Sequence, residues 1–464
     1  MFRSAGLFLA GFGVISSAAS FAGVFDPDVN GTGMTMDEYM IKVAGGDQPA
    51  GPVYTCYLGK FEITNRQFVD FLNDAELDAN SGSPTRRSSN MYFRSVTGNV
   101  YLDGSISGYE RICWIDCGSP GYDINHDPDA PAGSRYSVKP GLEKFPARHI
   151  SWVGALKFCN WLTIDQGLGE QHCCYTEGPD VGCWHPVTIS TEDWWGKEPA
   201  QDDWVSAGRD LNDDERSELV RRYRGYRLPM DDAGFLAGIS RPYPNDFNEW
   251  LKAAAYDPGA PDTIRTNDGG WQAIPHHWMY GFGREDNTGA DANWHSSGDP
   301  YDQGTVPVDY YDGSDHGGTF ATNDTNNRYG LYGMSGNVWE WCQDYGVSLE
   351  HRSTRGGSWV STPYRQAASS CYLFGRVYHA DMSFGLRILQ IADARGDFDR
   401  DNDVDQEDFD HFEACSTGPE VSQTGPDCQD VRLDDDEDVD QEDFGIFQAC
   451  LSGPDALAPL ECYR

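Results

Sequence analysis

The stretch YGLYGMSGNVWEW, which runs from Tyr329 to Trp341, decides the fold. Its glycines allow the backbone to turn tightly, and large aromatic residues follow the last glycine almost at once. We therefore predict a loop that leads directly into a core strand beginning near Val338. Taken alone, the stretch could also be an ordinary tryptophan-rich strand after a turn.

Two shorter blocks follow in order, Arg355-Gly-Gly-Ser-Trp359 and Phe384-Gly-Leu-Arg387. The order and spacing of the three blocks resemble the sulfatase-modifying-factor family, whose founding member is the formylglycine-generating enzyme. The resemblance covers residues 54–389. It implies an α+β domain of C-type-lectin-like fold, with little regular secondary structure and bound calcium.

Two predicted helices before these blocks resemble the same family. Tyr57–Ile63 alternates like a strand, and Thr64-x-x-Gln67 is a capping box that opens a helix. Ser151-Trp152 opens the second helix. Apolar residues recur at helical spacing after both starts, which predicts one buried face for each helix. These residues are Phe68, Phe71, Leu72 and Ala75 in the first helix and Ala155, Phe158, Cys159 and Leu162 in the second.

Three segments interrupt the family pattern, near residues 78–140, 171–224 and 230–247. The second carries Cys173, Cys174 and Cys183. Their spacing fits no standard zinc pattern, so we expect disulfides there rather than a metal.

Composition restricts the partners. The chain has 464 residues and a formal net charge of −40. Such a charge repels nucleic acid and anionic membranes, so we exclude sequence-independent DNA binding. Cations or basic surfaces are the natural partners.

Residues 1–22 read as a secretory signal. Arg3 precedes a short apolar stretch, and small residues follow as a cleavage site. A buried N-terminal helix is the alternative, and the stretch is too short to span a bilayer. We expect a secreted or cell-envelope protein, in which the thirteen cysteines pair by default and at least one is left over. Residues 23–53 are expected to form an irregular lead-in.

The resemblance also implies chemistry that this chain lacks. In the formylglycine-generating enzyme, two cysteines after the Gly-Gly-Ser-aromatic turn bind copper(I), and one engages the substrate cysteine. A soft thiolate pair suits Cu(I). Here the two positions hold Ser361 and Gln366, and matching residues 365–368 to the family's YRCAAR with a short deletion also leaves no cysteine. We predict the fold without bound Cu(I) and without the oxidase chemistry. Cys342 and Cys371 could form a displaced thiol pair, but a disulfide between them or separate structural roles fit an exported protein better.

The family's two calcium sites map onto this chain. The first falls on Asn293, the Trp294 carbonyl, Asp299 and the Tyr301 carbonyl. The second falls on Gly333, Gly336, Val338 and Glu340, with Gly333 where an asparagine would be expected. Mixed carbonyl and carboxylate oxygens suit Ca²⁺. Alternatively, Asp299 and Glu340 are ordinary polar groups of a loop and a strand.

Residues 396–464 form a second unit with 22 acidic and 3 basic residues, so they carry −19 of the total charge. The unit repeats every 35 residues, with Cys415 and Cys450 in register. Each copy resembles a dockerin-type EF-hand repeat, a calcium loop followed by one helix. A solvated acidic tail is the alternative. Loop positions 1, 3, 5, 7 and 12 of the first copy are Asp397, Asp399, Asp401, Asp403 and Asp408. The second copy keeps Asp434, Asp436, Asp438 and Asp443 but has Arg432 at position 1, so we expect weaker binding there.

Small units of this kind need additional cross-links for stability. Disulfides between Cys415 and Cys428 and between Cys450 and Cys462 could supply them. Three functions compete for the whole chain. It could be a non-catalytic binding or scaffold protein whose C-terminal unit docks to a protein or envelope partner. It could be a formylglycine-generating oxidase. It could also bind glycans, as a lectin-like frame rich in aromatic residues allows.

Overall fold

The computed structural model describes most of the chain. The described residues are 23–46, 51–79, 123–127, 129–177, 181–196, 208–231, 247–267, 270–301, 304–346, 351–377, 380–434 and 436–464. The predicted signal (1–22), most of the segment 78–140 and residues 232–246 lie outside them.

A four-stranded sheet forms around the aromatic stretch. Strand β7 (Trp339–Tyr345) is buried at every residue. It pairs antiparallel with β8 (His351–Arg355), which pairs antiparallel with β9 (Cys371–Arg376). The short β10 (Phe384–Gly385) lies parallel to β7 on its other side. The predicted core strand is therefore confirmed, and the three sequence blocks meet in one sheet.

A three-stranded sheet joins the two ends of this part of the chain. Strand β2 (Cys56–Gly59) lies between β1 (Met40–Val43) and β11 (Leu389–Ile391), antiparallel to both. The predicted strand 57–63 is thus shorter than expected. The lead-in 23–53 is not irregular throughout, because it supplies helix α1 (Met36–Tyr39) and strand β1.

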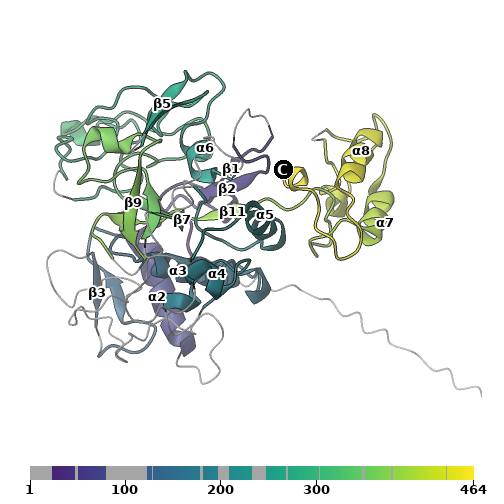
Figure 1. Ribbon diagram of the computed structural model, residues 1–464, viewed down its shortest axis with the longest axis horizontal. Coiled ribbons are helices and arrows are strands. Elements are labelled where there is room, and N and C mark those ends of the chain that lie inside the picture. Colours follow the sequence, from purple (N-terminus) through teal and green to yellow (C-terminus); the bar gives the residue numbers. More distant parts are fainter. Residues whose placement is uncertain are drawn as a thin grey trace, which may run out of the picture.

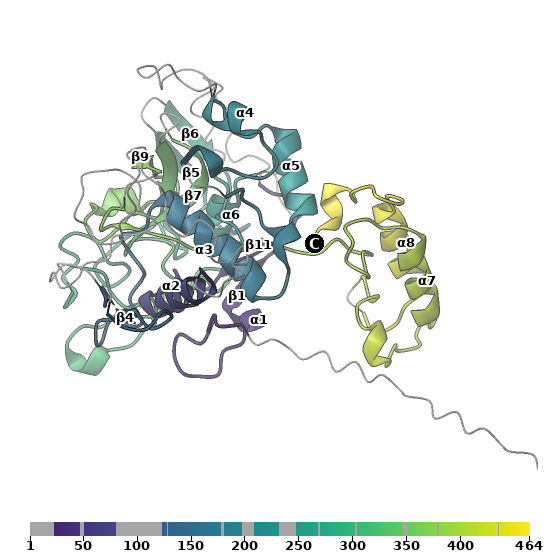
Figure 2. The ribbon, with the colours of Figure 1, turned by 90° about the horizontal axis from the view of Figure 1, so that it is seen from below.

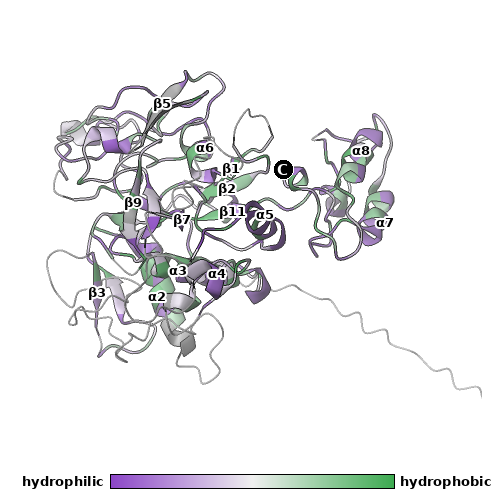
Figure 3. Cartoon of the chain, in the orientation of Figure 1, coloured by the Kyte–Doolittle hydropathy of each residue, from purple (hydrophilic) through white to green (hydrophobic). Residues whose placement is uncertain are grey.

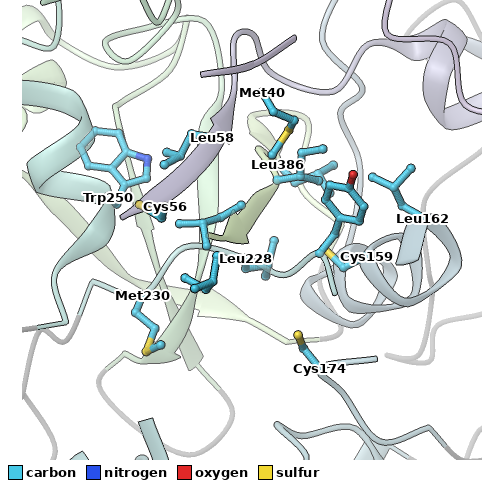
Figure 4. Packing of buried hydrophobic residues seen from close by; sticks show 14 of the residues in the cluster. Met40, Cys56, Leu58, Cys159, Leu162, Cys174, Leu228, Met230, Trp250 and Leu386 are labelled. Atoms are coloured by element: carbon cyan, nitrogen blue, oxygen red, sulfur yellow. The ribbon is translucent and has the colours of Figure 1, made fainter. Parts of the chain in front are cut away.

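Two long helices pack together beside the sheets (Figure 1). Helix α2 (Asn65–Ala79) follows the Thr64–Gln67 capping contacts, and α3 (Trp152–Asp165) is capped by the Ser151 hydroxyl. Both predicted apolar faces are fully buried. Figure 4 shows Leu162 of α3 in the same core as Leu58 of β2.

Shorter elements complete the description. The helices are α4 (Thr191–Trp195), α5 (Asp213–Arg222) and α6 (Glu249–Ala255), and the hairpins are β3 (Ile124–His126) with β4 (Tyr136–Val138) and β5 (Thr263–Asn267) with β6 (Gly270–Ile274). No helix in the described ranges is long and apolar enough to cross a bilayer.

The C-terminal unit stands to one side of the rest of the chain (Figure 1). Its helices are α7 (Gln406–Cys415) and α8 (Gln441–Cys450), which pack through aromatic rings such as Phe412 against Phe447. The two expected disulfides, Cys415–Cys428 and Cys450–Cys462, are present. Each joins the end of one helix to the segment after it.

A buried ion pair fastens α6 to the three-stranded sheet. The Arg227 guanidinium donates to both carboxylate oxygens of Glu249, and neither side chain is exposed. The Tyr54 hydroxyl and the Met230 amide also donate to this carboxylate, at 2.7 and 2.8 Å. The pair therefore has the extra hydrogen bonds that a desolvated charge requires.

We expect Glu249→Ala to lower the free energy of unfolding by about 3–5 kcal/mol, because a buried guanidinium then loses its counter-charge. Urea denaturation followed by tryptophan fluorescence measures the change. Glu218→Ala, which breaks an exposed pair with Arg222, serves as the control and should have almost no effect. Equal losses in the two variants would contradict the assignment.

Candidate functional site

The glycine-rich loop before β7 needs glycine at its last turn. Gly336 has a φ of 92°, and a Cβ there would lie 2.5 Å from the Asn293 carbonyl oxygen. The following residue, Asn337, also has positive φ and accepts a hydrogen bond from the Val306 amide at 3.0 Å. The loop is therefore fixed closely against the segment that carries the first predicted calcium site.

One arginine joins the sequence blocks. Arg387 donates through Nε and Nη2 to one oxygen of Glu340, at 2.9 and 2.7 Å. The side chains of Arg387, Glu340 and Trp250 are all buried. The other Glu340 oxygen accepts from the Trp250 indole at 2.7 Å. Arg387 also donates to the Gly59 and Tyr332 carbonyls, both at 2.7 Å.

A second buried carboxylate lies beside this pair. Glu62 accepts from the Asn337 amide at 3.2 Å through one oxygen, while its other oxygen has no hydrogen-bond partner among the described residues. Burial raises the pKa of Glu62 to about 8, although Arg387, whose Nη2 lies 3.9 Å away, acts in the opposite direction. The site thus holds two carboxylates and one fixed positive charge.

The turn after β8 carries the two residues that the sequence predicts at the family's copper positions. Ser361 is buried, and its hydroxyl lies 3.1 Å from that of Ser358. Gln366 is also buried, donating to the Asn293 carbonyl at 3.0 Å and accepting from the Asn287 amide at 2.9 Å. Both positions are therefore filled by hydrogen-bonded neutral groups.

Of the two alternatives for Cys342 and Cys371, the disulfide does not form, which leaves separate structural roles. Cys342 is on β7 and Cys371 on β9, and β8 lies between these strands. Strands two places apart are separated by about 9–10 Å, which exceeds the Cα spacing of about 7 Å that a disulfide allows. The same separation argues against a displaced copper pair. Cys174 and Cys183 also form no disulfide, and burial raises the pKa of Cys174 to about 12.

Apolar side chains surround the turn on the outside. Val360, Tyr364 and Met382 are 38%, 56% and 44% exposed. Met382 is tied to the turn through its carbonyl, which accepts from the Trp359 indole at 3.4 Å. Two of these exposed residues, Val360 and Tyr364, belong to the turn itself, and the third, Met382, is joined to it by this hydrogen bond.

The first predicted calcium site lies in a loop that closes on itself. Asn293 and Asp299 are buried, and the Asn293 side chain donates to the Gly304 carbonyl at 2.9 Å. One Asp299 oxygen accepts from the Tyr301 amide at 2.7 Å, and the Trp294 carbonyl accepts from the Ser297 amide at 2.9 Å. Of the four predicted residues, Asn293 and Asp299 are thus buried, Trp294 is partly buried and Tyr301 is 38% exposed, and oxygen donors of these kinds suit a hard cation.

The second predicted site fits a cation less well. Both Glu340 oxygens are engaged by Arg387 and Trp250, and a Cβ at Gly333 would lie 2.4 Å from Glu62. The remaining positions, Gly336 and Val338, offer only main-chain oxygens. A cavity of about 20 Å³, large enough for one water molecule, is lined by residues that include Asn293, Gly333 and Asn337.

The two acidic loops gather carboxylates as their spacing predicts. Oxygens of Asp397, Asp399 and Asp408 lie within 4.8 Å of one another, and so do those of Asp403, Asp405 and Asp408. The corresponding groups in the second loop are Asp434, Asp436 and Asp443, and Asp438, Asp440 and Asp443. The two loops differ at position 5. Asp436 of the second loop belongs to one of its groups, whereas Asp401 of the first loop belongs to neither.

The ionisation of the first loop reflects this crowding. Burial raises the pKa of Asp397 to about 6, and it also raises those of Asp403 and Asp408. One oxygen of Asp403, a residue only 6% exposed, has no partner in the described chain. An added positive charge would relieve all three groups.

Comparison with protein-family models matches residues 47–391 to the family described as "Sulfatase-modifying factor enzyme 1-like domain". The chain belongs to this family. A search of curated proteins finds no match.

Among solved structures, the sulfatase-modifying-factor chain is similar to Treponema denticola variable protein 1, with 18% identity over 76% of this chain and 94% of that one and a TM-score of 0.36. The chain is also similar to CarF, with 17% identity over 76% of this chain and 97% of that one and a TM-score of 0.38. A third similar structure is PvdO from Pseudomonas aeruginosa, with 15% identity over 76% of this chain and 90% of that one and a TM-score of 0.28.

Sequence reasoning missed two of the groups at this site. Glu62 was part of the predicted strand, and nothing in its alternation indicates that its side chain turns toward Gly333. Arg387 was recognised only as the end of a family block. Its pairing with Glu340 could have been suspected because each is a charged residue inside an apolar motif.

We expect the stability of the chain to depend on pH through Glu62. Its raised pKa means that the folded state keeps the proton between pH 4.5 and about 8 while the unfolded chain releases it, so stability falls as pH rises through that window. Glu62→Gln cannot ionise, and it should gain about 3 kcal/mol relative to wild type between pH 5.5 and pH 8.5. Urea denaturation at the two pH values checks this. An unchanged difference between the two proteins would contradict the assigned ionisation.

Proposed function

We propose that the chain is an exported, non-catalytic member of the sulfatase-modifying-factor family that acts as a binding or scaffold protein. The observation that carries the proposal is the occupation of the two copper positions by Ser361 and Gln366. Their side chains are hard, neutral and already hydrogen-bonded, and a soft Cu(I) ion requires thiolates. Cys342 and Cys371 are the described cysteines nearest in sequence before and after the turn. They lie on different strands, β7 and β9.

We place the ligand face at the turn 355–366. The exposed side chains of Val360 and Tyr364 on the turn, and of Met382 beside it, support this choice. A patch of this kind supports contact with a protein or envelope partner. The C-type-lectin-like fold of residues 54–389 is part of the same proposal, and it rests on the family membership.

Export is supported by the sequence of residues 1–22 and by the two disulfides of the C-terminal unit, since disulfides persist in oxidising compartments. We further propose that residues 396–464 form a dockerin-like module that holds calcium in its two acidic loops. Calcium at the first family site, through Asn293 and Asp299, belongs to the proposal as well. The second family site stays a prediction.

The first test is catalytic. We expect no copper-dependent conversion of a Cys-x-Pro-x-Arg peptide by the purified chain, because no thiolate pair is available to bind the metal at the turn. Mass spectrometry of the peptide after aerobic incubation with Cu(I) measures the outcome. A formylglycine-generating enzyme run in parallel provides the positive control. Turnover by this chain would favour the oxidase alternative.

The second test concerns calcium. We expect EGTA to increase hydrogen exchange in residues 397–408 of the full chain, because the carboxylates there repel one another without a counter-ion. The change should be smaller in residues 432–443, where Arg432 replaces one carboxylate. Asp408→Asn should abolish the effect in the first loop only, and Asp443→Asn in the second only. Exchange that is indifferent to EGTA in both loops would contradict the calcium module.

A glycan-binding role is the remaining alternative. The aromatic residues Trp359 and Tyr364 at the turn favour it, since exposed rings can stack on sugars. A glycan array probed with wild type and with Tyr364→Ala distinguishes it from protein binding. Wild-type signals that the substitution removes would favour the lectin alternative.

A further inference from the structure

An arginine of the sulfatase-modifying-factor domain reaches into the first acidic loop of the C-terminal unit. Arg224 follows α5 and forms an ion pair with the Asp397 carboxylate. Its Nε also donates to the Asn402 side chain at 3.1 Å. The Asp397 side chain is completely buried by this contact and its surroundings, and that of Arg224 is only 11% exposed.

Figures 1 and 2 agree on where this contact lies. In both views α5 is on the side of the domain that faces the C-terminal unit, and the C-terminus lies beside it. Figure 3 shows that α5 is mostly hydrophilic, and its two apolar residues, Leu219 and Val220, are buried. Charged contacts therefore contribute to the surface between the two parts, together with buried residues such as Ala458 and Tyr463, which belong to the same hydrophobic cluster as the domain core.

The acidic loop also has carboxylate oxygens that could hold a second positive charge. Asp403 presents a buried oxygen that has no partner among the described residues, and this residue shares a group of close oxygens with Asp405 and Asp408. Asp397 belongs to the adjoining group with Asp399 and Asp408. Arg224 and a cation held by the loop would thus share the charge of one carboxylate cluster.

We propose that Arg224 and a divalent cation are competing counter-ions of the first acidic loop, so that calcium binding loosens the C-terminal unit from the sulfatase-modifying-factor domain. The inference rests on the proposed calcium module. Two positive charges beside one carboxylate repel each other, and neutralising Asp397 from one side weakens its attraction to the other. The coupling is reciprocal. If cation binding weakens docking by a given factor, docking weakens cation binding by the same factor.

The remaining contacts suit a releasable interface. The Thr55 amide donates to the Tyr463 carbonyl at 2.6 Å, and the Tyr463 hydroxyl donates to the Arg221 carbonyl at 2.8 Å. Arg221 in turn donates to the Ala458 carbonyl at 3.4 Å. Two of these hydrogen bonds have neutral donors and the third has a guanidinium donor, and none of the three pairs two opposite charges. The Arg224–Asp397 pair is the more heavily buried charged contact.

The second loop lacks this arrangement. Its first position is Arg432, whose side chain donates to the Asp436 carbonyl within the same loop at 2.5 Å. The second loop therefore carries its positive charge permanently, and it forms no comparable ion pair with the first domain among the described residues. Only the first loop can exchange an arginine for a metal ion.

The test titrates the full chain with Ca²⁺ and follows hydrogen exchange in two segments. Residues 397–408 report filling of the first loop, and the Thr55 segment reports docking. We expect Ca²⁺ to protect the loop and to expose Thr55. Arg224→Gln should bind at about five- to tenfold lower Ca²⁺, because a neighbouring positive charge is gone. Arg224→Lys keeps the charge and should stay near the wild-type midpoint.

Arg222→Gln is the matched control. Arg222 lies two residues earlier, pairs with Glu218 on the solvent side and should leave both readouts unchanged. A loop that is protected by Ca²⁺ with the same midpoint in wild type and Arg224→Gln would overturn the competition while leaving the calcium module intact. A higher midpoint in Arg224→Gln, or an equal shift in the lysine variant, would also overturn it. A loop that Ca²⁺ never protects would overturn both.

Discussion

The ion pair between Arg387 and Glu340 is the contact on which the domain depends. Both side chains are fully buried, and removing two charges from water costs several kcal/mol per ion unless further hydrogen bonds compensate. Arg387 meets that requirement through carbonyl oxygens of Gly59 and Tyr332, and Glu340 does so through Trp250. One guanidinium therefore holds β2, the glycine-rich loop and β7 in a single arrangement.

This arrangement is compatible with the proposed loss of the family chemistry. The hydrogen bonds of Arg387 and Glu340 do not involve Ser361 or Gln366. Those two positions make their own contacts with Ser358, Asn287 and Asn293. Under the proposed function, serine and glutamine at these positions would remove a metal site without changing the contacts that support the fold, and the exposed side of the turn would bind the partner.

Much of this could be predicted from the sequence. The buried strand β7, the faces of α2 and α3 and the two disulfides were predicted, because apolar periodicity, a capping box and a repeat with cysteines in register are local signals. The sequence could not decide between a Cys342–Cys371 disulfide and separate structural roles, because the order of strands, which places β8 between the two cysteines, is not encoded locally. Arg224 and Glu62 were missed for the same reason, since their partners are remote in sequence.

The absence of a copper-binding thiol pair is the central claim, and Cu(I) binding by the purified full chain tests it most directly. A competition titration against a colorimetric Cu(I) chelator, with X-ray absorption on the copper that remains bound, gives both stoichiometry and ligands. The account predicts no cuprous ion coordinated by two sulfurs at the turn. One Cu(I) per chain held by two thiolates, and lost when Cys342 or Cys371 is replaced by serine, would contradict it.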